Sequence, residues 1–226
     1  MARKVAGREL AGLLVVGAVA LGAVLLLRGS RGEPPAPAPP VAAAEALSLL
    51  AGLRQETQSH WESYDRRAFG EPLWTDDTDA PDGGNGCDTR DDVLRRDIPD
   101  GDHGTGCGVR AGTLRDPYTG RELYYDRRQA SEIETDHVVA LGAAWRSGAW
   151  AWEPQRRRAF ANDTGNLLAV SRAANQEKRS QTPDNWRPRR EFWCGYASRY
   201  TMIKSRYELS VTATERDALA DMLGTC

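Results

Sequence analysis

The pattern of apolar and polar residues divides the chain into a hydrophobic start, a spacer and a domain. Residues 10–27 carry no charged or polar side chain, and as a helix they would extend about 27 Å, close to the hydrocarbon thickness of a bilayer. Basic residues within 1–9 precede this run. We therefore predict a transmembrane signal anchor that places the rest of the chain outside the cytoplasm. A signal peptide cleaved within 41–46 (VAAAEA) is the alternative, and it also leads to export.

The hydrophobic run is followed by a spacer and then by the part of the chain that can build a core. Residues 28–43 form a Pro- and Ala-rich linker, in which PPAPAPP at 34–40 favours extended polyproline geometry. We expect one domain over 44–226, because this length lies within the usual size of a single domain. At its start, leucines recur at helical spacing within 44–58 and predict a short amphipathic helix.

Local signals predict two further helices and one hairpin. The segment CDTRDDVLRRD at 87–97 places Asp88 or Thr89 as a cap ahead of a helical pattern. Within 109–127, the turn sequence DPYTG separates two segments that can pair as strands. Near the end of the chain, TATE at 212–215 has the capping-box pattern that begins a helix. These signals together indicate a mixture of helices and antiparallel strands.

The middle of the chain has a third kind of pattern. Two short apolar runs, VVAL at 138–141 and NLLAV at 166–170, are expected to be strands that frame a polar loop. A helical pattern follows Ser171. Strand, long loop, strand and helix in this order predict a ββα unit at about 132–182, within a domain of the α+β class.

This unit brings together side chains suited to phosphodiester hydrolysis. The reaction needs an activated water and neutralised phosphate charge, which an imidazole base and one hard cation can supply. His137 suits the first task, and the side-chain oxygens of Asp136 and Asn175 suit the second, because Mg²⁺ completes its shell with water and phosphate. Mn²⁺ or another divalent ion would fit the same ligands. Glu134 would share the strand face of Asp136, in the outer shell of the metal or paired with an arginine.

Consecutive strand residues point to opposite faces of a sheet, which conflicts with a common site for Asp136 and His137. We therefore expect an irregular backbone at these two residues.

The four cysteines support export. Cys87, Cys107, Cys194 and Cys226 all follow the apolar run, and none belongs to a C-x-x-C pair. Two disulfides are the simplest account of this usage. Among three pairings, Cys87 with Cys107 and Cys194 with Cys226 are favoured, because each closes a loop within one region. A structural zinc site is the competing account, but the paired thiolates typical of such sites are missing from the sequence.

Positive charge is concentrated in the second half of the chain. The formal net charge is −2, so the chain as a whole is not basic. Between Trp145 and Glu208, however, Arg and Lys outnumber Asp and Glu, and tryptophans are interleaved among them. This composition is typical of a surface that meets phosphates and bases, and an Arg-rich solvated face would share it.

The motifs D-H-V-V-A-L, N-L-L and N-x-x-K resemble the signature of HNH (ββα-metal) endonucleases, with Asn rather than His at the third signature position. The segments CDTRDDVLRRD, DPYTG and FANDTGNLLAV, with the C-terminal Trp-Cys helix, resemble exported HNH proteins related to the C-terminal domain of GmrSD-type restriction enzymes. This likeness covers about 64–226. It implies a ββα-metal (HNH/His-Me finger) core with flanking helices and a β-hairpin, stabilised by disulfides.

The resemblance also implies a role for each motif residue. His137 would be the general base, Asp136 and Asn175 would bind one divalent metal ion, and Asn166 would brace the loop behind His137. Lys178 lies one helical turn beyond Asn175, from where it would contact the substrate phosphate. The arginines expected to contact the substrate are Arg90, Arg172 and Arg179.

These observations predict a metal-dependent endonuclease that acts outside the cytoplasm as a monomer. Its substrate would be nucleic acid, with DNA favoured and no sequence specificity, because no reader domain is recognisable. The alternative is a catalytically silent, membrane-anchored module that binds nucleic acid or the cell envelope. The motifs G-x-S-x-G and H-E-x-x-H are absent from the sequence, so a serine hydrolase or a zinc peptidase is not indicated.

Overall fold

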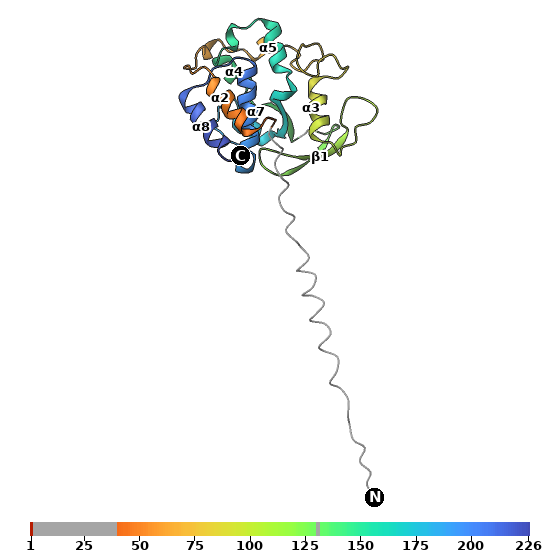
Figure 1. Ribbon diagram of the computed structural model, residues 1–226. Coiled ribbons are helices and arrows are strands. Elements are labelled where there is room, and N and C mark those ends of the chain that lie inside the picture. Colours follow the sequence, from red (N-terminus) through yellow and green to blue (C-terminus); the bar gives the residue numbers. More distant parts are fainter. Residues whose placement is uncertain (2–39, 130–131) are drawn as a thin grey trace. The chain divides into compact units, whose positions relative to one another are not determined.

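A computed structural model describes residues 1, 40–129 and 132–226 (Figure 1). Its described helices and strands belong to the unit Pro35–Cys226. In chain order they are α2 (Ala43–Gly52), η1 (Trp61–Ser63), η2 (Arg66–Phe69), α3 (Thr89–Asp97), β1 (Ala111–Arg115), β2 (Glu122–Asp126), β3 (Ile133–His137), α4 (Leu141–Arg146), η3 (Ala149–Ala151), α5 (Pro154–Ala161), η4 (Thr164–Asn166), β4 (Leu167–Ser171), α6 (Arg172–Lys178), η5 (Arg190–Phe192), α7 (Trp193–Arg206) and α8 (Ala213–Leu223). The α+β class is confirmed.

The predicted membrane span at 10–27 lies outside the described residues, as does nearly all of the linker. Among the residues that the structure describes, no helix is long and apolar enough to cross a membrane. The boundaries expected for the anchor, the linker and the domain stay predictions.

Several helix ends follow the local signals of the sequence. Asp88 caps α3, because its side chain accepts a hydrogen bond from the backbone of Asp91. Thr212 and Glu215 form the predicted capping box at the start of α8. The first helix is shorter than its leucine pattern, since α2 ends at Gly52 and Gln55 then pairs with Val211. That pairing ties the start of the domain to its C-terminal part.

The sequence around DPYTG forms the predicted hairpin. β1 and β2 pair antiparallel, with Leu114 opposite Leu123. Both leucines are buried with Leu94 of α3 and Val109 in one apolar cluster. The hairpin therefore packs against α3, while its other face, which includes Tyr124, is exposed.

The second sheet consists of β3 and β4, which pair antiparallel in a regular ladder. All five residues of β4 are buried, and its first four residues alternate between two apolar clusters. Leu167 and Ala169 join the cluster of α3, whereas Leu168 and Val170 join the larger cluster built around α4, α5, α7 and α8. The ladder thus separates the two parts of the core, and α6 follows it directly.

Two expectations for this region were wrong. VVAL is not a strand: β3 ends at His137, Val138 and Val139 are buried in the larger cluster, and α4 begins at Leu141. The long segment before β4 is not a polar loop either, because it contains α4 and α5. Alanines and arginines in this segment favour helices, and tryptophan and phenylalanine side chains supply their buried faces. Short apolar runs in the sequence could not distinguish a strand from a buried connection, or a polar loop from a segment with two helices.

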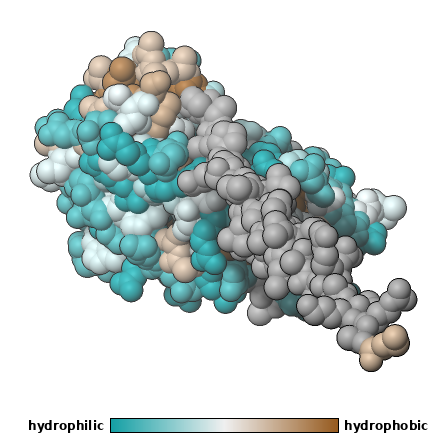
Figure 2. Space-filling view, turned by 90° about the horizontal axis from the view of Figure 1, so that it is seen from below, coloured by the Kyte–Doolittle hydropathy of each residue, from teal (hydrophilic) through white to brown (hydrophobic). Residues whose placement is uncertain are grey.

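The surface is mainly polar. On the face shown in Figure 2, hydrophilic residues predominate and hydrophobic residues gather at one end. Among the described residues, the large apolar side chains with the greatest exposure in the domain are Leu47, Trp61, Tyr124 and Trp150. The other apolar residues of the helices are largely turned inward.

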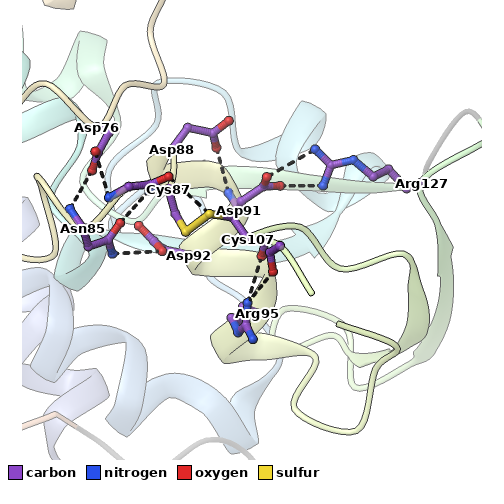
Figure 3. Close-up of a disulfide and its surroundings, with 11 residues drawn as sticks. Asp76, Asn85, Cys87, Asp88, Asp91, Asp92, Arg95, Cys107 and Arg127 are labelled. Carbon is purple, nitrogen blue, oxygen red and sulfur yellow. Dashed lines mark hydrogen bonds and ion pairs between the residues drawn. A yellow bond between two sulfur atoms is a disulfide. The ribbon is translucent and has the colours of Figure 1, made fainter. Parts of the chain in front are cut away.

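Both favoured disulfides are confirmed. Cys87–Cys107 joins the segment before α3 to the segment before β1, with a Cα–Cα distance of 5.4 Å. Cys194–Cys226 joins the first turn of α7 to the end of the chain, at 5.1 Å. Figure 3 shows the first disulfide beside the Asp88 cap and the ion pair between Asp91 and Arg127. A zinc-cysteine site is excluded among the described residues, since all four thiols are used.

The C-terminal disulfide is expected to contribute strongly to stability. Replacing Cys194 and Cys226 by alanine should lower the free energy of unfolding by about 3–4 kcal/mol, because the bond closes a loop with a sequence separation of 32 residues. Urea unfolding of the exported domain measures this change. An unchanged unfolding midpoint would contradict the prediction.

Candidate active site

His137 is buried at the end of β3, where two aromatic rings and a carbonyl group hold its imidazole. Trp74 and Phe160 lie nearly parallel to it, with ring centroids at 5.4 and 6.4 Å. Nε2 lies 2.8 Å from the carbonyl oxygen of Ala161. Because a carbonyl oxygen only accepts hydrogen bonds, Nε2 carries the proton and the lone pair is on Nδ1. The geometry prepares Nδ1 to act as a base.

The protonation state of His137 follows from its burial. Its exposed fraction is 4%, and burial lowers the pKa of the imidazole to about 3, with a smaller contribution in the same direction from the charges of Arg66 and Lys178. The imidazole is therefore neutral at neutral pH. A neutral imidazole is the form that a general base requires.

Two adjoining cavities open beside β3. The smaller one, of about 190 Å³, is lined by His137 together with Tyr64, Leu141, Arg179 and Ser180, among others. The larger one, of about 710 Å³, contains Trp74 and four arginines. Arg66, Thr135 and Asn175 line both cavities. His137 thus lines a cavity that shares three of its lining residues with a cavity containing four arginines.

Asp136 occupies a different environment from His137. The ladder is regular through both residues, with Asp136 opposite Leu168 and His137 opposite Leu167, so the expected irregular backbone is not found. The two side chains consequently lie on opposite faces of the strand. Asp136 is on the side of the larger apolar cluster, and a part of its surface lines the smaller cavity.

The carboxylate of Asp136 is held by two buried side chains. Lys178 Nζ lies 2.9 Å from its Oδ2, and the Tyr118 hydroxyl donates to the same oxygen at 2.6 Å. Burial raises the pKa of Asp136, and the neighbouring Lys178 and Tyr118 oppose that rise. Both carboxylate oxygens therefore already have partners inside the protein.

Lys178 does not lie where a substrate contact requires it. Its side chain is fully buried, and Nζ also donates to the carbonyl oxygen of His137 at 2.8 Å. The ammonium group thus ties α6 to the end of β3. The expected contact between Lys178 and a substrate phosphate is not compatible with this burial, and the spacing of three residues from Asn175 could not reveal it.

Asn166 lies behind His137, at the position that the family resemblance implies. Its side-chain oxygen accepts a hydrogen bond from the backbone of Val139 at 2.9 Å, and its amide donates to the carbonyl oxygen of Val139 at 3.3 Å. The carbonyl oxygen of Asn166 also accepts from the backbone of Val138 at 2.7 Å. Asn166 thereby fixes the chain direction immediately after His137.

Glu134 and Asn175 supply the oxygens that face the larger cavity. Asn175 Nδ2 donates to Glu134 Oε2 at 2.9 Å, and Arg172 Nε lies 3.2 Å from Glu134 Oε1. The Glu134 side chain is one-third exposed. Among the described residues, no three His, Cys, Asp or Glu side chains form a group that could hold a metal ion. Any metal site here would have few protein ligands.

The arginines around the cavities come from distant parts of the chain. Arg90 is carried by α3, Arg172 by α6, and Arg127 follows β2, where its guanidinium meets both oxygens of Asp91 at 2.8 and 3.2 Å (Figure 3). Arg179 follows α6 and lines the smaller cavity. Arg90, Arg172 and Arg179 were expected from the sequence as substrate contacts, and the structure brings all three to the cavities.

Sequence reasoning missed several residues that line this space, among them Arg66, Trp74, Arg127 and Thr135. Each of these four lies outside the motifs, and three of them approach the ββα unit only through the fold. For Thr135, its place two residues before His137 was an available signal, because alternate strand residues share a face.

Comparisons with known proteins identify a family and a relative of this chain. A family model described as GmrSD restriction endonucleases, C-terminal domain, matches residues 88–222. A protein of Arthroderma benhamiae, named an uncharacterized secreted protein, is 39% identical over 197 residues, which cover 85% of this chain and 91% of that protein. No solved structure matches the chain. From the family match and the cavity around His137, we conclude that the chain belongs to the family of GmrSD restriction endonuclease C-terminal domains.

Proposed function

We propose that this chain is a metal-dependent endonuclease with His137 as its general base. The single observation that carries the proposal is the orientation of the imidazole. Its Nε2 proton is fixed on the carbonyl oxygen of Ala161, which leaves Nδ1 as the basic nitrogen of a residue that lines the smaller cavity. The membership of the chain in a restriction endonuclease family supports the same reaction.

The reaction can be described through the residues of the chain. Nδ1 of His137 accepts a proton from a water molecule as the water oxygen attacks phosphorus, and the bond from phosphorus to the leaving oxygen breaks. Guanidinium groups from Arg90 and Arg172 neutralise phosphate charge and position the strand. Asn166 keeps the backbone behind His137 in place, so the base does not move away from the phosphate.

The donor set beside His137 suits one hard divalent cation. Glu134 and Asn175 offer oxygens toward the larger cavity, and a cation such as Mg²⁺ accepts one or two protein ligands with water and phosphate completing its shell. We therefore propose Asn175 and Glu134 as ligands, because the Glu134 side chain is one-third exposed toward solvent. Asp136 takes a positioning role, because its carboxylate is buried between Lys178 and Tyr118. When bound, the cation would neutralise charge on the phosphate and the leaving oxygen.

The substrate and the location follow from the same features. Arginines of the cavities would recognise phosphates rather than bases, which favours cleavage without sequence specificity. The restriction endonuclease family favours DNA as the substrate. The disulfides and the secreted fungal relative fit action outside the cytoplasm. We further propose that residues 10–27 anchor the chain in the membrane and that the domain acts as a monomer.

Removal of divalent metal is expected to abolish activity. The purified domain should nick or degrade plasmid DNA with Mg²⁺ or Mn²⁺, and EDTA should reduce cleavage to background, because phosphate charge is then not neutralised. Calorimetry with Mn²⁺ separates the ligand assignment from catalysis. Asn175→Ala should weaken Mn²⁺ binding, whereas Gln176→Ala, an exposed change on the same helix, should not.

A catalytically silent binding module is the second candidate. It is favoured by the ion pair between Lys178 and Asp136, which occupies a carboxylate expected to bind metal. If the wild-type domain binds DNA but leaves it intact with Mg²⁺, Mn²⁺ and Ca²⁺, this candidate replaces the nuclease.

A further inference from the structure

The junction of the two cavities contains groups that no motif explains. Arg66, Thr135 and Asn175 are the residues that line both cavities, and His137 lies in the wall of the smaller one. A strand that passes from one cavity into the other must cross this junction. We propose that Arg66 and Thr135 bind the non-bridging oxygens of the scissile phosphate there. This inference rests on the proposed nuclease function and deepens it by naming residues that bind the scissile phosphate.

The short helix that carries Arg66 packs against an aromatic neighbour of His137. Arg66 is the first residue of η2, which Asp65 caps by accepting a hydrogen bond from the backbone of Arg67. Phe69 of the same helix is buried and packs against Phe160 at 6.0 Å between ring centroids. Phe160 in turn lies parallel to the His137 ring. Through this aromatic contact, η2 positions the base and the arginine together.

The charge of Arg66 is not compensated by an acid. Among the described residues, no carboxylate lies within ion-pair distance of its guanidinium, and its polar neighbour is the uncharged hydroxyl of Tyr64. The adjacent Arg67 differs, because its guanidinium meets Asp65 at 2.9 Å. In the larger cavity, Arg127 and Arg172 are paired with Asp91 and Glu134. Arg66 therefore has its full charge available to an anion at the junction.

Thr135 supplies the second group. Its hydroxyl oxygen is buried and has no hydrogen-bond partner in the part of the chain that the structure describes. The residue is two positions before His137 in a regular strand, so their side chains share a face. Buried hydroxyl groups are nearly always satisfied in folded proteins. A phosphate oxygen at the junction would accept the hydrogen bond that this hydroxyl lacks.

The two groups are complementary in what they can donate. A guanidinium offers several N–H donors in a planar fork and matches a phosphate in geometry and charge. The threonine hydroxyl donates one hydrogen bond from the strand that carries the base. Contacts to the scissile phosphate should strengthen as charge grows in the transition state, whereas contacts to a flanking phosphate would serve binding alone.

Kinetics of Arg66→Ala and its neighbour Arg67→Ala test the arginine. With plasmid DNA and Mg²⁺, Arg66→Ala is expected to lower kcat by about a hundredfold, whereas Arg67→Ala should stay within about twofold of the wild type because its side chain pairs with Asp65. Arg66→Lys should recover part of the loss. A loss in Arg66→Ala that is confined to KM would overturn the assignment, since it would place Arg66 on a flanking phosphate.

An isosteric change tests the hydroxyl of Thr135. Thr135→Val should lower kcat roughly tenfold, because one donor to the phosphate is removed, and Thr135→Ser should keep most of the activity. Removal of a buried hydroxyl that lacks a partner should leave the thermal unfolding temperature unchanged or raised. A lower unfolding temperature in Thr135→Val, with activity lost equally in Thr135→Ser, would show a structural role and overturn the proposal for this residue.

Binding without metal separates this inference from the nuclease proposal. In EDTA, Arg66→Ala should bind a short fluorescein-labelled DNA strand about tenfold more weakly than Arg67→Ala, with a smaller salt dependence. If that difference is found while the wild type is inert with every metal, the phosphate site stands and the nuclease proposal fails. If the wild type cleaves DNA and Arg66→Ala and Thr135→Val cleave equally fast, this inference fails and the nuclease proposal stands.

Discussion

Replacing His137 by alanine is expected to slow phosphodiester cleavage by about a hundredfold to ten-thousandfold, which is the range that a general base contributes. The effect should appear in kcat, because the imidazole would act on the attacking water, whereas the arginines that line the cavities would hold the phosphates. Plasmid nicking followed at saturating DNA with Mg²⁺ measures it.

His103→Ala is a matched control for this experiment. Its ring nitrogen lies 3.0 Å from the carbonyl oxygen of Ile98, and the residue lines neither cavity beside β3. We expect its rate to equal that of the wild type. His137 also packs between Trp74 and Phe160, so near-UV circular dichroism should accompany the kinetics. A folded His137→Ala domain that cleaves at the wild-type rate would remove His137 from the mechanism.

The parts of the fold that could be predicted from the sequence are those fixed by short-range interactions. A cap satisfies backbone N–H groups only a few residues away, so Asp88 and Thr212 mark their helices wherever these helices pack. The same holds for the hairpin around DPYTG and for two disulfides that close loops within one region.

The parts that could not be predicted depend on which elements meet. The apolar character of VVAL fits a strand or a buried connection equally well, and only packing in the larger cluster decides between them. Likewise, a lysine in a polar segment gives no sign that it will be buried beside Asp136. Arg66 belongs to a short helix far from the motifs, and it reaches the junction through the contact between Phe69 and Phe160.

The candidate active site also contains features that the sequence indicated and features that depend on packing. The motif residues His137, Asn166 and Asn175 lie on β3, η4 and α6, which follow one another along the chain, and their roles stay predictions. The motif did not indicate that a regular ladder would turn Asp136 and His137 to opposite faces. The burial of Asp136 between Lys178 and Tyr118 is what transfers the expected ligand role to the partly exposed Glu134 in our proposal, and it gives Lys178 a structural partner in place of a phosphate.

Breaking the buried ion pair between Lys178 and Asp136 is expected to destabilise the domain strongly. Lys178→Met should lower the free energy of unfolding by about 3–5 kcal/mol, because it leaves a buried carboxylate without its cation. Combining it with Asp136→Asn should recover part of this loss, since the remaining amide is neutral and can still accept from the Tyr118 hydroxyl. Urea unfolding of both variants at neutral pH measures the difference.

The same variants discriminate between the two roles of Asp136. Lys178→Met frees the carboxylate oxygens that the ammonium group occupies. If Asp136 only positions the end of β3, Mn²⁺ affinity should not rise in Lys178→Met, and catalysis should fall because the carbonyl oxygen of His137 also loses its donor. The contrary result would be tighter Mn²⁺ binding in Lys178→Met that disappears when Asp136→Asn is added. It would show that Asp136 is a metal ligand whose oxygens are occupied by Lys178 in the wild type. The buried lysine would then control access of the metal to the site.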